Sequence, residues 1–113
     1  MKIVECVPNF SEGRDLYKIG AIVKEIESTS EVKLLGVEPD PDYNRTVVTF
    51  AGTPEGVKEA ARKAIARAGE LIDMSQHRGS HPRLGAADVV PFVPIRGVTM
   101  EECVRLAVEL ARE

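Results

Sequence analysis

The chain has 113 residues, 43% of them hydrophobic, and its 15 Lys and Arg against 18 Asp and Glu give a net charge of −3 at pH 7. A chain of this length buries roughly two thirds of its unfolded surface, so one core can form without disulfides or metals. Positive and negative charges are interspersed, which argues against nucleic-acid binding. No apolar run approaches the roughly 20 residues of a membrane span, so we expect one soluble, cytoplasmic domain over residues 1–113.

The first half of the chain predicts a strand, a helix and a pair of strands. Residues 3–7 are mostly β-branched and roughly alternating, as in a short strand. Apolar residues recur every three or four positions over residues 16–26, which is the spacing of one buried helical stripe. Residues 32–37 and 45–50 predict two antiparallel strands, and the two prolines in residues 38–42 predict a loop between them.

The second half begins with a clear helix start and contains one long segment without periodicity. Residues 53–55 supply a threonine cap, a proline for the first helical position and an early acid, and the apolar stripe continues over residues 57–72. Between residues 73 and 88 the periodicity disappears, which marks a loop. Residues 89–95 look extended, and a capping box over residues 99–102 starts a third helix that runs to the C-terminus.

This order, β-α-β-β-α-β-α, begins as the split βαβ unit of the ferredoxin-like fold. We therefore predict an α+β sandwich with one mixed or antiparallel sheet and helices on one face. Cys6 lies in the first strand pattern and Cys103 on the stripe of the last helix. Because two thiols in a cytoplasmic protein are usually reduced, we expect both to be small core residues and not a disulfide or nucleophiles.

The loop between residues 73 and 88 holds both histidines of the chain, His77 and His81, together with Gly79, Pro82 and flanking arginines. A neutral imidazole is a suitable general base near neutral pH, and arginine binds carboxylates. A solvated surface loop explains the same residues equally well. A zinc site is disfavoured, because glycine and proline disrupt the helix that this histidine spacing would need and no Cys-x-x-Cys accompanies it.

Two further polar segments are candidate ligand sites. Residues 40–45 gather two carboxylates, an amide and a cation between two predicted strands, and Asn9 follows the first strand. Aspartate and asparagine are also ordinary turn residues, so a purely structural role explains both segments as well.

Several segments, taken together, carry a resemblance to a known family. They are residues 5–13 (ECVPNFSEG), residues 44–47 (NRTV) and residues 71–94, from LIDM to HPRLGAADVVPFVP, extended by residues 54–57 (PEGV) and 97–103 (GVTMEEC). In this order they resemble the N-terminal subdomain of glutamate formimidoyltransferase, the folate enzyme of histidine breakdown that is often fused to a cyclodeaminase. The resemblance covers nearly the whole chain.

The resemblance implies transfer of a formimidoyl group from N-formimidoyl-L-glutamate to N5 of tetrahydrofolate, which is a co-substrate, giving 5-formimidoyltetrahydrofolate and L-glutamate. The catalytic histidine of the family lies in its His-Pro-Arg segment, which matches His81 here, and we expect no metal. As a hypothesis of our own, based on polarity and position in the shared motifs, Asn9, Asn44, Arg45 and Arg83 bind the substrate.

The family places folate in a cleft between this subdomain and a second one, and nothing in the chain matches that second subdomain. The resemblance therefore implies a C-terminal subdomain or a partner chain, and an exposed sheet edge beside the third helix makes a homo-oligomer plausible. Two alternatives stay open at this point. The chain is a non-catalytic binding subdomain of the same fold, or it belongs to a glutamate formyltransferase with the same base and the same folate nitrogen.

Overall fold

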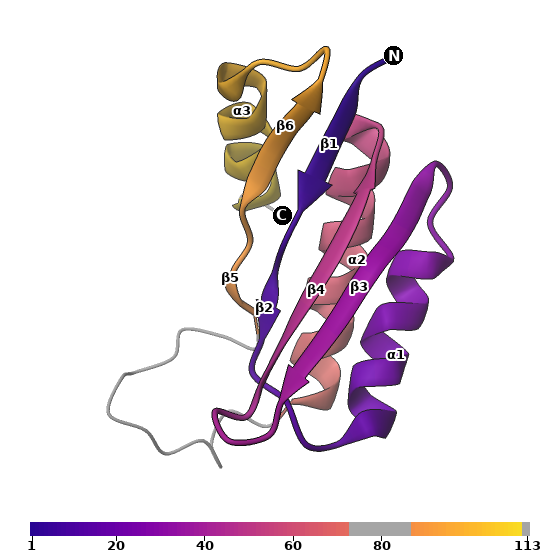
Figure 1. The fold of residues 1–113 in the computed structure, drawn as a ribbon, viewed down its shortest axis with the longest axis vertical. Helices are drawn as coiled ribbons and strands as arrows, with labels where there is room; N and C mark the ends of the chain where they lie inside the picture. The colour runs from indigo at the N-terminus through magenta and orange to yellow at the C-terminus, as the bar shows by residue number, and fades with distance from the viewer. Residues whose placement is uncertain (73–86, 112–113) are drawn as a thin grey trace.

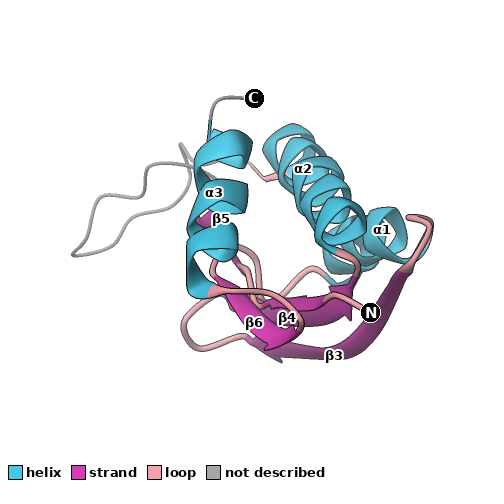
Figure 2. Cartoon of the chain, turned by 90° about the horizontal axis from the view of Figure 1, so that it is seen from above, coloured by secondary structure: helices cyan, strands magenta, loops and turns pink. Residues whose placement is uncertain are grey.

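The computed structural model describes residues 1–72 and 87–111 (Figure 1). This part of the chain contains six strands and three helices: β1 (Ile3–Cys6), β2 (Asn9–Phe10), α1 (Leu16–Glu27), β3 (Val32–Asp40), β4 (Arg45–Gly52), α2 (Pro54–Leu71), β5 (Ala87–Val89), β6 (Phe92–Arg96) and α3 (Met100–Ala111). Seen from above, the three helices lie on one side of the strands (Figure 2). The predicted α+β class and the single sheet are confirmed.

All strand pairs in this sheet are antiparallel. β1 and β2 follow one another along one edge of β4, and β3 pairs with the other edge. Beyond them, β6 pairs with β1 and β5 pairs with β2. Backbone hydrogen bonds continue across the gap between β1 and β2, from Val48 N to Pro8 O at 3.1 Å and from Val7 N to Pro91 O at 3.2 Å. The last strands of the chain are thereby held beside the first.

Two predicted strand boundaries are wrong. The prolines of residues 38–42 predict a loop, but β3 continues through Pro39, which pairs with Thr46, to Asp40. Proline is tolerated there because β3 pairs only with β4 among the described strands, and an edge strand does not need every N–H for pairing. The single extended segment predicted over residues 89–95 is instead divided between β5 and β6.

The core lies between the sheet and the helices and is built from alternate strand residues and from one stripe on each helix. Its buried apolar side chains include Val4, Cys6, Phe10, Val48, Phe50, Phe92, Ile19, Ile22, Ile26, Val57, Ala60, Ala61, Ala64, Ala68, Cys103 and Leu106. The alanines of α2 let this helix lie close to the sheet and to α1. Full burial of a side chain such as Phe10 contributes about 2 kcal/mol, so the short strand β2 is firmly anchored.

The cysteines are both free and buried, as predicted. Burial raises the pKa of the Cys6 thiol to about 12, and it also raises the pKa of Cys103, because a low-polarity environment disfavours the thiolate. A thiol that remains protonated at neutral pH is a poor nucleophile. Both cysteines therefore act as small core residues.

Two of the helices begin at the threonine caps that the sequence predicts. Thr53 Oγ1 accepts a hydrogen bond from Gly56 N at 3.1 Å, and Thr99 Oγ1 accepts one from Glu102 N at 3.2 Å. The Glu102 carboxylate accepts from Lys2 Nζ at 3.1 Å, which ties the start of α3 to the residue before β1. Within the described ranges, every helix is too short or too polar to cross a membrane.

Candidate functional site

Asn9 and Arg45 lie on the face of the sheet that the helices leave open. In β2, Phe10 is buried against the helices and its neighbour Asn9 is half-buried. Asn9 is the register partner of Val47 in β4, and Arg45 is two residues away from Val47 on the same strand. Since successive side chains of a strand alternate between faces, Arg45, Val47 and Asn9 share one face. Asn9 and Arg45 are thus diagonal neighbours, and such pairs lie about 7–8 Å apart in a sheet, so one small ligand can contact both side chains.

Asn9 also lies beside β5, the strand that follows the segment with both histidines in the sequence. Its second register partner is Val89 in β5, and Phe10 pairs with Ala87 in the same strand. The predicted base, His81, and the predicted ligand Arg83 lie outside the described residues, between the end of α2 and the start of β5. The structure thus brings Asn9 and Arg45 together and places neither His81 nor Arg83.

Asn44, the third predicted ligand within the described residues, has a structural contact. Its Oδ1 accepts a hydrogen bond from Gly13 N at 2.9 Å, across 31 positions of sequence. Its backbone is left-handed, with φ of 52°, a conformation that asparagine tolerates better than most residues. The Thr46 hydroxyl donates to the Glu12 carbonyl oxygen next to this bond. Two hydrogen bonds therefore join the loop after β2 to the residues on either side of Arg45.

Glu12 organises that loop from within, and our sequence interpretation missed it. The residue is only 8% exposed, and its Oε2 accepts from Arg14 N and Asp15 N at 3.1 Å each. Its Oε1 lies 3.9 Å from Lys18 Nζ. A buried carboxylate needs such partners to offset the loss of water. The bonds to Arg14 N and Asp15 N span only two and three residues, so the available sequence signal was a carboxylate placed just before the start of a helix.

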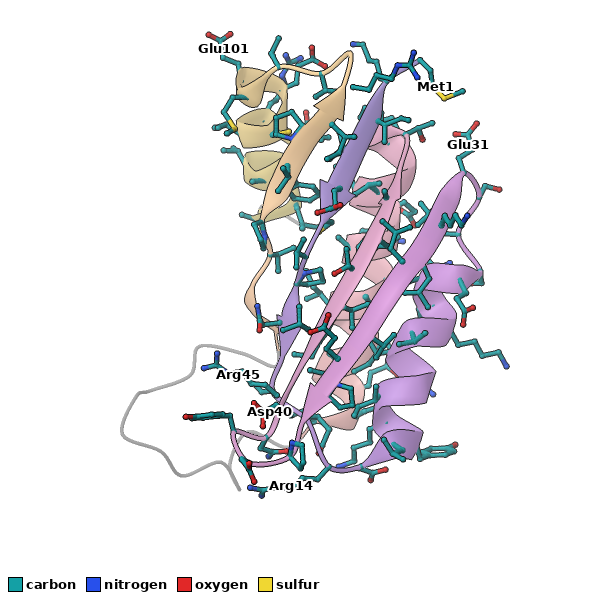
Figure 3. All side chains as sticks on the ribbon, viewed as in Figure 1. Met1, Arg14, Glu31, Asp40, Arg45 and Glu101 are labelled. Carbon is teal, nitrogen blue, oxygen red and sulfur yellow. The ribbon has the colours of Figure 1, made fainter. Side chains whose placement is uncertain are left out.

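The other acidic and basic groups of the β3–β4 turn mainly hold the turn together. Asp40 Oδ1 accepts from Asp42 N at 3.1 Å and from Tyr43 N at 3.3 Å, the arrangement of an Asx turn. Arg14 Nε donates to Pro41 O at 2.7 Å and so links the preceding loop to the turn. Figure 3 shows Arg14, Asp40 and Arg45 at the same end of the sheet. Of the polar residues 40–45, Asp40 and Asn44 therefore make structural contacts, and exposed Arg45 is the candidate ligand.

Metal ligands do not gather in the described ranges. No group of three His, Cys, Asp or Glu side chains there is arranged to hold an ion. The groups that Asn9 and Arg45 present are an amide and a guanidinium, which suit an anionic or amide-containing organic ligand.

Comparison with known proteins gives consistent matches over nearly the whole chain. Residues 3–113 match the family model described as formiminotransferase domain, N-terminal subdomain. A glutamate formimidoyltransferase of Thermoplasma acidophilum is 53% identical over 112 residues, which are 99% of this chain and 37% of that protein. A glutamate formimidoyltransferase of Streptococcus pyogenes serotype M1 is 46% identical over 97% of this chain and 37% of its own length.

A fused enzyme matches equally well. The formimidoyltransferase-cyclodeaminase of Sus scrofa is 56% identical over 106 residues, which are 94% of this chain and 20% of that protein. The chain therefore spans between one fifth and two fifths of the length of these curated relatives.

Proposed function

Since this chain belongs to the family of formiminotransferase N-terminal subdomains, we propose that it is part of a folate-dependent transferase. In this proposal the chain carries the general base and binds the formimidoyl donor, N-formimidoyl-L-glutamate. The reaction moves a formimidoyl group from N-formimidoyl-L-glutamate to N5 of tetrahydrofolate and releases L-glutamate. His81 is the general base, and Asn9, Arg45 and Arg83 bind the donor. Asn44, the other residue that the sequence hypothesis named, is not among the residues proposed to contact the substrate, because its side-chain oxygen accepts a hydrogen bond from Gly13 N.

One observation carries this proposal: Asn9 and Arg45 share the open face of the sheet beside β5. The donor has two carboxylates, and a guanidinium binds a carboxylate through two parallel hydrogen bonds. His81 precedes Ala87, the first residue of β5, by six positions (87 − 81). Six residues span at most about 20 Å, so chain length allows the imidazole to reach the face that holds the donor.

The reaction requires one group that first accepts a proton and later returns it. N5 of tetrahydrofolate attacks the sp² formimidoyl carbon, and His81 takes the N5 proton as the new C–N bond forms. The tetrahedral intermediate then breaks the bond between this carbon and the glutamate nitrogen. The imidazolium returns the proton to that nitrogen, so L-glutamate leaves as the amine and the base is regenerated.

We also propose that residues 1–113 form a single domain of the ferredoxin-like kind and that it works in the cytoplasm. A C-terminal subdomain or a partner chain would complete the folate cleft. The position of β4 between β1 and β3 supports the ferredoxin-like arrangement. The greater length of the relatives supports the second subdomain. We further propose that the chain self-associates through an exposed edge of its sheet.

The function is tested by measuring L-glutamate release by the intact polypeptide that carries this chain. We expect release from N-formimidoyl-L-glutamate that depends on tetrahydrofolate, with kcat/KM at least about tenfold higher than for N-formyl-L-glutamate. Preference for the formyl donor would instead identify a glutamate formyltransferase. Donor binding without release would identify a non-catalytic binding subdomain, and either result contradicts the proposal.

Replacement of Arg45 by methionine is expected to raise KM for N-formimidoyl-L-glutamate by about tenfold, the effect of losing one charged hydrogen-bonded contact. The kcat should stay within about threefold, because the base lies on another segment. Arg45→Lys keeps the charge but not the paired geometry and should give an intermediate KM. Steady-state kinetics checks this, with Arg96→Met, at an exposed position at the end of β6, as the matched control that leaves KM unchanged.

A further inference from the structure

We infer that Asn44 is a positioning residue, which holds the backbone of Arg45 in place through its side-chain contact with Gly13. The inference rests on the proposed role of Arg45 as a ligand of the donor. It replaces the direct substrate contact that the sequence hypothesis gave to the Asn44 side chain with a positioning role for its oxygen.

The hydrogen bond between Gly13 N and Asn44 Oδ1 lies immediately before Arg45 in the chain. It is 2.9 Å long and partly buried, so water competes with it less than at an open surface. The left-handed φ of 52° at Asn44 turns the chain from the β3–β4 turn into β4. Asn44 therefore sets the direction in which the chain enters Arg45, and its side chain fixes that point of the chain to the Gly13 backbone.

The Gly13 backbone is packed directly against the backbone of Arg45. A Cβ atom placed on Gly13 would lie 2.5 Å from Arg45 N and 2.6 Å from Arg45 O, closer than real contacts allow. On the far side of Arg45, the buried Thr46 hydroxyl donates to the Glu12 carbonyl oxygen. Arg45 thus lies between two cross-links to the same loop, with the Gly13 backbone in contact between them.

This arrangement matters because the arginine side chain is long and flexible. Its guanidinium reaches a carboxylate in paired geometry only when its backbone is fixed, and a displacement of about 1 Å weakens such positioning. Loss of the Asn44 oxygen should therefore reduce donor binding. It should leave the proton transfer at His81 largely unchanged, because His81 is carried by a different segment.

Two substitutions separate the positioning role from direct binding. Asn44→Gly keeps the left-handed backbone and removes the acceptor, whereas Asn44→Asp keeps an acceptor oxygen and removes the amide donor. In the intact polypeptide, we expect Asn44→Gly to raise KM for N-formimidoyl-L-glutamate by about fivefold with kcat within about twofold. The Asn44→Asp variant should have a KM within about twofold of the wild-type value.

Three kinetic results would overturn the inference. A KM in Asn44→Asp as high as in Asn44→Gly would show that the amide nitrogen contacts the donor directly. A fall in kcat with unchanged KM would show a general structural defect. An Arg45→Met variant with unchanged KM would refute the proposed role of Arg45, and the inference would fail with it.

Amide hydrogen exchange at Gly13 tests the contact without any activity measurement. We expect exchange to be about fivefold faster in Asn44→Gly and unchanged in Asn44→Asp, because only the first variant leaves this N–H without its acceptor. Equal exchange in the wild type and in Asn44→Gly would refute the contact itself. This outcome is distinct from a failure of the proposed function, which the glutamate-release assay and the Arg45 kinetics detect.

Discussion

Replacement of His81 by alanine is expected to lower kcat for formimidoyl transfer by about 10²- to 10⁴-fold, the range of a positioned general base. The proton on N5 must leave while the bond to the formimidoyl carbon forms. Without a base, the charged adduct expels N5 again before the glutamate nitrogen can depart. KM for the donor should change little, because Asn9 and Arg45 lie on strands of the sheet.

The other histidine of the chain provides a matched control. His77 lies four residues before His81 in the sequence, so its replacement by alanine changes the composition of the same segment to a similar extent. We expect kcat of His77→Ala to stay within about threefold of the wild-type value, since only one base is needed. A His81→Ala enzyme that retains kcat within about tenfold would rule out His81 as the base.

Substitution of Gly13 by alanine is expected to lower the free energy of unfolding by about 3 kcal/mol, at the upper end of overpacking effects. The added Cβ would meet the Asp40 carbonyl oxygen and would lie 2.5 Å from Arg45 N and 2.6 Å from Arg45 O. All three are backbone atoms, and Asp40 and Arg45 are register partners at the end of the β3–β4 ladder. Relief of the clash therefore requires the backbone of the Gly13 loop or of the ladder end to move.

Urea denaturation of the two proteins measures this loss. Gly20→Ala on the exposed side of α1 is the matched control, because nothing lies within 4 Å of a Cβ placed there. Alanine is the better helix former, so the control should gain about 0.5–1 kcal/mol. Equal midpoints for Gly13→Ala and the wild type would contradict the packing of this loop against the hairpin.

Local sequence patterns predict most of the fold. The helix starts at Thr53 and Thr99 are correct because a cap and a periodic stripe are both local properties. The end of β3 beyond Pro39 depends on β3 being an edge strand, which is known only once β4 has paired on one side. In the same way, the break between β5 and β6 depends on pairing with β2 and β1, two separate strands.

The candidate site could be predicted in part. Asn9 and Arg45 stand out by polarity, but their common face follows from the register of β2 against β4, which joins distant parts of the chain. The contact between Gly13 and Asn44 is equally non-local, so no local pattern around Gly13 predicts it. The role of His81 rests on the family resemblance and on the chemistry of imidazole, since His81 lies outside the described residues.

The pH dependence of kcat/KM in the wild type and in His81→Ala tests most directly whether an imidazole on this chain takes the proton from N5. A base must be neutral to accept a proton, so wild-type kcat/KM should fall as the pH drops through the range in which an imidazole becomes protonated, and should level off above that range. We predict that this step disappears in His81→Ala. The same step, with the same midpoint, in the variant would contradict the assignment of His81 as the base.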